Sequence, residues 1–376
     1  MASSCAAEAP RLLHDFGAAA GPLPDAVRSA VIEACADWRA QGSVLSLSFA
    51  SDAGRELMQQ TRASLVRLLE VPDSHDVLFM QGGASAQFGL VPANLLRSPA
   101  EAGLYVESGH WSRRAIAQAR QQASVHSVDG RALFGAGATD DAWPLALERA
   151  TASAGAPAYV HLTSNETADG RQCRAWPECA APLVVDMTSD FLSRPVDWSR
   201  VALAYAALQK LIGVAGLTVV IVRRDLLVPA ERPLPRVFDY AAQSAAASRV
   251  NTPPLFAIFV AHAMLAWIAD AGGLQAVEAA VRRRSERVYR ALDEAALYRV
   301  GIGGAARSHT SICFAVAARD GAAALVEAAG ERGLRGLAGH AAHGGLRLAN
   351  YAGTSDAAID ELCACLREFT RAELPS

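Results

Sequence analysis

Short apolar runs alternate along this chain with longer stretches in which apolar residues recur at helical spacing. The helical pattern predicts helices over Asp25–Trp38 and Gly54–Leu69, and Val71-Pro72-Asp73 follows the end of the second. The apolar runs predict strands at Val77–Met80, Gly103–Val106, Ala158–Leu162, Pro182–Val185, Val201–Ala207, Leu217–Val222 and Ser311–Val316. Strands that alternate with helices are typical of an α/β protein with a mostly parallel sheet.

The chain changes character near Asn251-Thr252-Pro253-Pro254, where two prolines precede a long helical region. There the pattern predicts a helix within Gly273–Ala296 that has one apolar face. The opposite face is expected to be mostly solvated and carries Arg282, Arg283, Arg284 and Arg287. We expect a flexible N-terminal segment (1–15), a large domain (16–260) and a smaller C-terminal α/β domain (261–376).

Composition supports a sizeable core and excludes several kinds of partner. Hydrophobic residues make up 52% of the 376 residues and charged residues 19%, which excludes a largely disordered chain. The net charge of -3 offers no electrostatic surface for nucleic acid or an anionic membrane. No apolar run approaches the roughly 20 residues of a membrane span, and the N-terminus lacks the pattern of a secretion signal. The seven cysteines contain no C-x-x-C pair, which argues against a metal site and favours the reducing cytoplasm.

One residue count changes the picture: of the 35 basic residues, only Lys210 is a lysine. In a chain that otherwise uses arginine, a single lysine is either a chance survivor on the surface or a residue whose chemistry arginine cannot supply. A lysine amine can lose its proton and attack a carbonyl, whereas a guanidinium stays charged. Composition alone leaves both interpretations open, so the position of Lys210 decides between them.

Lys210 lies between two predicted strands, Val201–Ala207 and Leu217–Val222, on a loop where catalytic groups tend to lie. Upstream, an apolar run ends in Asp186, which is either a helix cap or a carboxylate of the site. An aspartate at a strand end followed by an isolated lysine is typical of pyridoxal phosphate (PLP) enzymes. Gly82-Gly83 follows another strand and precedes a helix, an arrangement that can bind phosphate through backbone N–H groups. By itself, a glycine pair is weak support, because many such pairs are only tight turns.

These motifs together resemble the phosphoserine aminotransferase family, PLP enzymes of class V with the aspartate-aminotransferase-like fold type I. The resemblance extends from about Phe16 to Glu368. It is carried, in order, by QGGASAQF with VPANLL, SNETADG, DMTSDFLSRPVD, AYAALQKLIGVAGLTVVIVRRDLL and NTPP. It implies a large domain with a mostly parallel seven-stranded sheet and a PLP-dependent transfer of an amino group between an α-amino acid and a 2-oxo acid.

The resemblance also assigns roles around the cofactor ring. Lys210 would bind the aldehyde of the cofactor and later act as the base that moves the substrate α-proton. Asp186 would pair with the pyridine nitrogen, and Trp111 would stack on the ring. Thr167 would form a hydrogen bond near the ring hydroxyl. The alternative for Trp111 and Thr167 is that they are ordinary packing residues.

The resemblance implies a phosphate site that two subunits share. Ala84 and Ser85, which follow the glycine pair, would bind the cofactor phosphate with help from Gln209. Asn251 and Thr252 would reach the same phosphate from the neighbouring subunit. A homodimer is therefore part of the prediction.

The substrate pocket departs from the family pattern. Arg347 is kept and would bind the substrate α-carboxylate, and His340 is kept as a substrate-binding residue. The family's Ser-His-Arg, which binds the distal phosphate or carboxylate, has no counterpart in the segment 46–56, where alignment places Phe49-Ala50 or Asp52-Ala53. A second arginine of that pocket has become Ala341. We therefore expect an altered specificity, for a distal group that is small, apolar or cationic.

Three alternatives stay open at this stage. The chain could be a true phosphoserine aminotransferase in which Arg55, Arg62 or His343 compensates for the lost cations. It could be a lyase or racemase on the same scaffold, because a fold and a cofactor do not determine the reaction. It could also be a non-catalytic paralogue, although the retained Lys210 and Asp186 argue against this.

Overall fold

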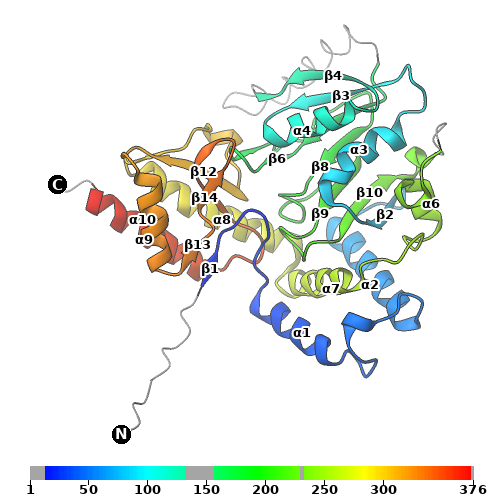
Figure 1. The fold of residues 1–376 in the computed structure, drawn as a ribbon, viewed down its shortest axis with the longest axis horizontal. Helices are drawn as coiled ribbons and strands as arrows, with labels where there is room; N and C mark the ends of the chain where they lie inside the picture. Colours follow the sequence, from blue (N-terminus) through cyan, green and yellow to red (C-terminus); the bar gives the residue numbers. More distant parts are fainter. Residues whose placement is uncertain (1–12, 132–155, 229–232, 374–376) are drawn as a thin grey trace.

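The computed structural model describes residues 13–131, 156–228 and 233–373. Its largest element is a seven-stranded sheet (Figure 1). The strands, in spatial order, are β2 (His75–Met80), β10 (Thr218–Arg223), β9 (Val201–Ala207), β8 (Leu183–Asp186), β5 (Tyr159–Thr163), β3 (Ala102–Glu107) and β4 (Ser124–Asp129). Only β10 runs against its neighbours β2 and β9, while the pairs from β9 to β4 are all parallel. The predicted α/β fold with a mostly parallel sheet is therefore confirmed.

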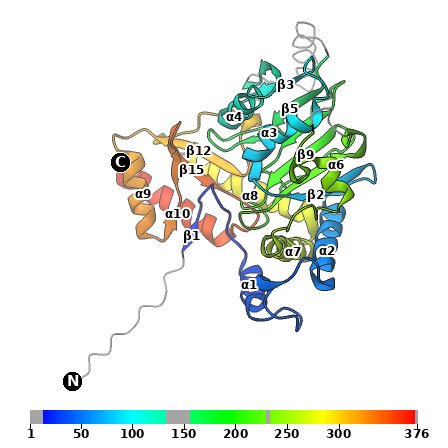
Figure 2. The ribbon, with the colours of Figure 1, turned by 45° about the vertical axis from the view of Figure 1, so that its right-hand side comes forward.

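Both faces of this sheet are covered by helices, as alternate residues of its strands show. In β2, Val77 and Phe79 belong to one apolar core, whereas Leu78 and Met80 belong to another. Helices α1 (Asp25–Ala36), α2 (Asp52–Leu69) and α7 (Leu255–Asp270) contribute to the first core. Helices α3 (Gly83–Leu95), α4 (His110–Ala119) and α6 (Tyr240–Ala245) contribute to the second (Figure 2). Because both faces are buried, the central strands are continuous apolar runs without alternation.

Strand β4 escaped the sequence prediction because its sequence, Ser-Val-His-Ser-Val-Asp, lacks an apolar run. Among the described residues it lies at the edge of the sheet and pairs only with β3, and several of its side chains are exposed. An edge strand needs less apolar surface than a central one, and propensity gives little indication of it.

The C-terminal part of the chain forms a second sheet of four antiparallel strands. Its strands are β11 (Tyr298–Arg299), β12 (Ser311–Val316), β15 (Gly344–Ala349) and β14 (Ala338–His340). Its helices are α8 (Gly273–Asp293), α9 (Gly321–Glu331) and α10 (Asp356–Glu373). Two further sheets have two short strands each. In one, β1 (His14–Asp15) pairs with β13 (Leu334–Arg335), and in the other, β6 (Asn165–Glu166) pairs with β7 (Arg171–Gln172). Residues 1–12 of the expected flexible N-terminal segment lie outside the described residues.

Helix α8 joins the two parts of the molecule. Val277 and Val281 in its first half pack in the core of the large sheet, whereas Val288 and Leu292 pack in the core of the small one. The physical separation between the two cores thus falls within α8. The proposed domain boundary at residue 260 stays a prediction.

The expectation of a solvated arginine face on α8 is wrong for Arg284. Its side chain is buried, and its guanidinium donates to the side-chain Oδ1 of Asn350 at 2.9 Å and to the carbonyl of Tyr351 at 3.1 Å. Arg283 and Arg287 form ion pairs with Asp356 at the start of α10. Helical periodicity could not show this, because the segment after β15 and helix α10 supply the partners.

Among the described residues, no single helix has both the length and the apolar composition needed to cross a membrane. Helices α7 and α8 meet that test only as a pair, and they are bent by 86° at their junction.

Candidate active site

A cavity of about 390 Å³ lies at the carboxyl end of the parallel strands and gathers most of the predicted site residues. Its lining includes Ala84, Ser85, Trp111, Thr167, Asp186, Gln209, Lys210, His340 and Arg347. In open α/β sheets, ligands bind in a crevice outside the carboxyl ends of the strands. These residues are far apart in sequence, and the family resemblance is what led us to expect them at one site.

Lys210 is placed by the loop that leaves β9, and the N-terminal segment holds this loop. The backbone N–H of Gly21 donates to the carbonyl of Gln209 at 2.8 Å. A Cβ atom on Gly21 would lie 1.8 Å from the carbonyl oxygen of Lys210, so only glycine permits this close approach. The Nζ atom of Lys210 lies 5.5 Å from the centre of the Trp111 ring.

The environment of Lys210 favours its neutral form. The pKa of Lys210 is lowered from 10.5 to about 8, chiefly because the amine is buried; the charge of Asp186 opposes this shift and the charge of Arg347 adds to it. A lysine amine that loses its proton near pH 8 is a competent nucleophile and base. Arginine could not take this role, because its pKa stays above the accessible range.

Asp186 is the last residue of β8, and its side chain is buried. Its Oδ1 accepts a hydrogen bond from the backbone N–H of Thr188 at 2.9 Å. Burial raises the pKa of Asp186, while the bonds from Thr188 and the charge of Lys210 lower it. A buried carboxylate of this kind is stabilised by a cationic donor in the cavity, such as a protonated ring nitrogen.

The glycine pair forms the predicted turn before a helix. Gly82 and Gly83 adopt φ values of +95° and +67°, which glycine tolerates without strain. Helix α3 begins at Gly83, so the N–H groups of Ala84 and Ser85 lie in its first turn, where they have no partner inside the helix. A first turn of this kind on a cavity wall can bind an anionic phosphate.

Trp111 is held by two residues of one block. Its indole Nε1–H donates to the Oγ1 of Thr167 at 2.7 Å, so both residues are joined at the cavity wall. The buried carboxylate of Glu166 accepts from the backbone N–H groups of Trp111 at 2.8 Å and Ser112 at 2.9 Å. Glu166 therefore caps α4 and fixes the position of Trp111.

Sequence reasoning missed Glu166 although it quoted the block Asn165-Glu166-Thr167. It also missed Asn165, which lines the cavity and bonds to Ser189 and Ser308 at 2.7 and 2.5 Å. The sequence offered no signal for either residue beyond their position beside Thr167, because their burial is seen only in the structure.

Arg347 has donor capacity left for a ligand. One terminal nitrogen of its guanidinium donates to the carbonyl of Thr167 at 3.0 Å. Its Nε is buried and has no hydrogen-bond partner among the described residues. Because an unpaired buried donor is costly, this atom fits a site that a carboxylate completes.

Four residues named from the sequence lie elsewhere in the described chain. Asn251 and Thr252 are exposed and do not line the cavity of Lys210. Arg55 and Arg62 line a separate cavity of about 350 Å³, together with Arg249. In that cavity, Arg62 donates through Nε to the carbonyl of Val77 at 3.0 Å.

The segment in which the family's Ser-His-Arg is expected is instead part of a helix start. The Oγ of Ser51 accepts from the backbone N–H of Gly54 at 3.1 Å and caps α2. Arg55 forms an ion pair with Asp52 in the first turn of the same helix.

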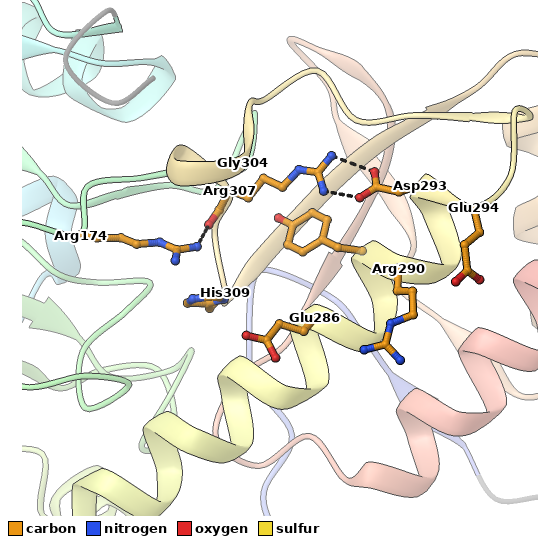
Figure 3. A pocket seen from close by; sticks show the side chains of 9 residues that line it. Arg174, Glu286, Arg290, Asp293, Glu294, Gly304, Arg307 and His309 are labelled. Carbon is orange, nitrogen blue, oxygen red and sulfur yellow. Dashed lines mark hydrogen bonds and ion pairs between the residues drawn. The ribbon is translucent and has the colours of Figure 1, made fainter. Parts of the chain in front are cut away.

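A larger cavity, of about 530 Å³, lies beside α8 and shows different chemistry (Figure 3). Arg307 forms a two-pronged ion pair with Asp293 at 2.5 and 2.8 Å, and its guanidinium lies over the ring of Tyr289. Arg174 donates to the carbonyl of Arg307 at 2.7 Å. These contacts join a loop that follows β7 to α8, and Lys210 is not part of this cavity.

Comparison with known proteins agrees with the fold. The aminotransferase class V family matches residues 14–352. The phosphoserine aminotransferase of Ectopseudomonas mendocina (strain ymp) is 38% identical over 366 residues, which cover 95% of this chain and 98% of that protein. The structure of the phosphoserine aminotransferase from Bacillus circulans subsp. alkalophilus superposes with a TM-score of 0.88 at 32% identity, covering 96% of this chain and 99% of that one. The PLP-bound phosphoserine aminotransferase from Trichomonas vaginalis gives a TM-score of 0.86 at 30% identity, over 95% of this chain and 100% of that one.

The fold and the cavity thus define a PLP-dependent aminotransferase of class V, which moves an amino group between an α-amino acid and a 2-oxo acid. Within this class, the chain belongs to the phosphoserine aminotransferase family. The resemblance inferred from the sequence motifs, and with it the cofactor, is confirmed.

The residues of the cavity fit this cofactor. A buried aspartate, an amine whose pKa is about 8 and a helix start behind two glycines lie in one cavity. These groups complement a ring nitrogen, an aldehyde and a phosphate. When bound, PLP supplies an electron sink that stabilises negative charge on the substrate α-carbon.

The lowered pKa of Lys210 predicts how the rate at which the cofactor-free protein binds PLP depends on pH. The neutral amine is the reactive form, so the rate of holoenzyme formation should rise about tenfold per pH unit below pH 8 and level off above it. The rate is measured from the visible absorbance of the bound cofactor between pH 6 and pH 10. A midpoint near 10.5, the ordinary value for lysine, would contradict the proposed environment of Lys210.

Proposed function

We propose that this aminotransferase prefers, at neutral pH, an α-amino acid whose distal end is uncharged or cationic. The cations that line its cavity in the described chain are Lys210 and Arg347. The first is needed for the chemistry and the second for the substrate α-carboxylate. No permanent charge in that lining is then left for a distal phosphate or carboxylate.

The size of the expected effect follows from the strength of the lost contacts. Charge-assisted, two-pronged hydrogen bonds from arginine are strong, and the exposed Ala341 cannot replace them. Each lost contact costs on the order of a hundredfold in binding. Binding of phosphoserine and of glutamate should therefore be weak.

The roles of the residues in the reaction follow from their positions. Arg347 would bind the substrate α-carboxylate through its unpaired Nε and orient the α-carbon toward Lys210. The amine of Lys210 would then remove the α-proton of the amino acid. In the second half of the reaction, it would return a proton to the α-carbon of the 2-oxo acid that takes up the amino group. Asp186 would keep the ring nitrogen protonated, and Trp111 would cover one face of the ring and exclude water.

We also infer that the cofactor phosphate is completed by a second copy of this chain. Asn251 and Thr252 are exposed, and Gln81, next to the glycine pair, donates to the carbonyl of Thr252 at 2.9 Å. The proposal therefore needs a homodimer. A mass measurement in solution that finds a fully active monomer would exclude this arrangement.

A second candidate is phosphoserine aminotransferase itself, which is the name of the relatives described above. The observation in its favour is the cavity lined by Arg55, Arg62 and Arg249. A partner subunit would have to bring these arginines to the distal end of the substrate. This candidate differs from the first in the charge of the preferred substrate.

One titration separates the two candidates. The visible absorbance of the holoenzyme is followed while phosphoserine, glutamate, alanine, glutamine or ornithine is added at pH 7.5. We expect the cofactor band to change at low concentrations of uncharged or basic amino acids and only at about hundredfold higher concentrations of phosphoserine. A change at low phosphoserine would establish the second candidate, and no change with any amino acid would exclude both.

A further inference from the structure

Three histidines form a cluster beside the cavity of Lys210, and two of them have no role in the site described so far. They are His110, His340 and His343, and we call them the imidazole cluster. The ring centres of His110 and His340 are 4.4 Å apart, and that of His343 lies 6.5 and 6.1 Å from these two. Within the described part of the chain, no group of His, Cys, Asp or Glu could hold a metal ion.

The cluster is built by two elements that also build the cavity. His110 is the first residue of α4, next to Trp111, whose backbone Glu166 holds. His340 ends β14 and lines the cavity, and its ring lies 6.2 Å from that of Trp111. His343 lies in the short turn that follows, where its backbone N–H donates to the carbonyl of His340 at 2.9 Å.

The proton positions in the cluster can be assigned in part. The backbone N–H of Ala342 donates to the Nδ1 of His340 at 3.2 Å. Nδ1 of His340 is then an acceptor, so the neutral ring carries its proton on Nε2. Protonation of Nδ1 would break this hydrogen bond, which favours the neutral ring in the free protein.

Charged groups around the cluster act mostly in the same direction. Burial lowers the pKa of His110, followed by the charges of His340 and Arg114. Burial also lowers the pKa of His340, followed by the charges of Arg347 and His343. At neutral pH these two rings are therefore uncharged.

Two further charges complete the surroundings of the cluster. Arg113, also on α4, lies 3.8 Å from Glu107, and its charge lowers the pKa of His110. Asp169, in the turn between β6 and β7, is the acidic group near the cluster; burial raises its pKa, and the charge of His343 is among the influences that lower it. Asp169 is also engaged by Arg171, which lies 3.7 Å away.

We propose that the imidazole cluster is the subsite for the distal end of the substrate. It binds a distal carboxylate by taking up a proton, and it accepts an uncharged distal end without one. This inference rests on the proposed function, because it concerns the distal end of a substrate bound in the cavity that His340 lines and beside which His110 and His343 lie. His110 and His343 thereby become residues that determine specificity.

The imidazole cluster would allow one distal subsite to bind both substrates of an aminotransferase. The enzyme binds two different substrates in turn in one cavity, and both must fit its distal subsite. Permanent arginine charges favour two acidic substrates, whereas imidazoles can match one acidic and one uncharged partner, because their charge changes near neutral pH. An anion bound beside His110 and His340 raises their pKa, so its affinity increases as the pH falls.

The test uses two unreactive ligands of equal chain length with the holoenzyme. Glutarate and pentanoate each carry one carboxylate for Arg347, and only glutarate carries a second at the distal end. Binding is measured by calorimetry from pH 6 to 8.5, in buffers with different ionisation enthalpies. We expect glutarate to take up about one proton and to lose about tenfold in affinity per pH unit above pH 6.5, while pentanoate does neither.

Three histidine variants show which side chains take up the proton when glutarate binds. His110→Gln and His343→Gln are expected to reduce the proton uptake of glutarate and to weaken its binding at pH 6 by about tenfold, because glutamine cannot become charged. His126→Gln, on the edge strand β4, is the matched control and should bind both ligands as the unchanged protein does. The visible absorbance of each variant shows that the cofactor is still bound.

Three results would overturn the inference. Glutarate could bind with the same affinity at every pH, which would point to a permanent charge such as Arg114. Glutarate could fail to bind at all, or pentanoate could show the same proton uptake. The proposed function fails in a different way, because it requires amino acids to change the cofactor absorbance, and this can be tested without either ligand.

Discussion

Replacing Lys210 with arginine is expected to lower the rate of amino-group transfer by about four orders of magnitude. Arginine keeps the positive charge and much of the length, but its guanidinium neither attacks the aldehyde nor accepts the α-proton. General base catalysis alone contributes about 10²–10⁴-fold, and the covalent attachment of the cofactor is lost as well. The measurement is the single-turnover rate of the variant reconstituted with PLP.

The composition of the chain permits an unusually clean control for this experiment. Lys210 is the only lysine, so reduction of the holoenzyme with borohydride should label one side chain, which mass spectrometry can locate. In Lys210→Arg, no internal label should appear. If the variant retained wild-type rates, or if the label appeared elsewhere, the assignment of Lys210 would be wrong.

Replacing Asp186 with asparagine is the second change with a large expected effect. The amide has nearly the same shape but no charge, so it cannot hold a proton on the ring nitrogen. We expect the rate of transfer to fall by about 10²–10³-fold, which corresponds to about 3–4 kcal/mol of transition-state stabilisation. Because burial raises the pKa of Asp186, removal of its charge should not destabilise the empty protein.

The matched control for Asp186→Asn is Asp293→Asn in the cavity beside α8. This change removes the ion pair between Asp293 and Arg307 (Figure 3). Lys210 does not line the cavity in which this pair lies. A half-exposed ion pair contributes about 1 kcal/mol or less, so the rate of transfer should change less than twofold. Equal losses in both variants would show that Asp186 acts only through the stability of the fold.

Several features of the site could be predicted because they are local in sequence. The strand that ends in Asp186, the glycine pair before α3 and the lysine loop after β9 each combine a recognisable pattern with one chemical residue. Central strands are buried on both faces, so their apolar runs are clear in the sequence. Strand β4 has no such local pattern, because it is a polar edge strand without an apolar run, and therefore it could not be predicted.

Other features depend on partners that are distant along the chain. Arg284 was expected on a solvated face, yet it is buried against Asn350 and Tyr351. Glu166 accepts a hydrogen bond from the backbone N–H of Ser112 in α4, which lies 54 residues before it in the sequence. No periodicity shows such contacts, because helical spacing identifies the faces of an element and not the element that packs against it.

The sequence by itself determined the family and the cofactor, and it identified Lys210 as the candidate for the chemistry. A single lysine, a strand-end aspartate and motifs in order are sufficient for this, since they reflect local geometry and residue chemistry. Only the tertiary structure decided which side chains lie together around the cavity of Lys210. The ring centres of His110 and His340 are 4.4 Å apart, although 230 residues separate them in the sequence, because α4 and β14 come together beside the cavity that His340 lines. Patterns along the chain cannot predict such contacts, because the packing of the two parts of the molecule produces them.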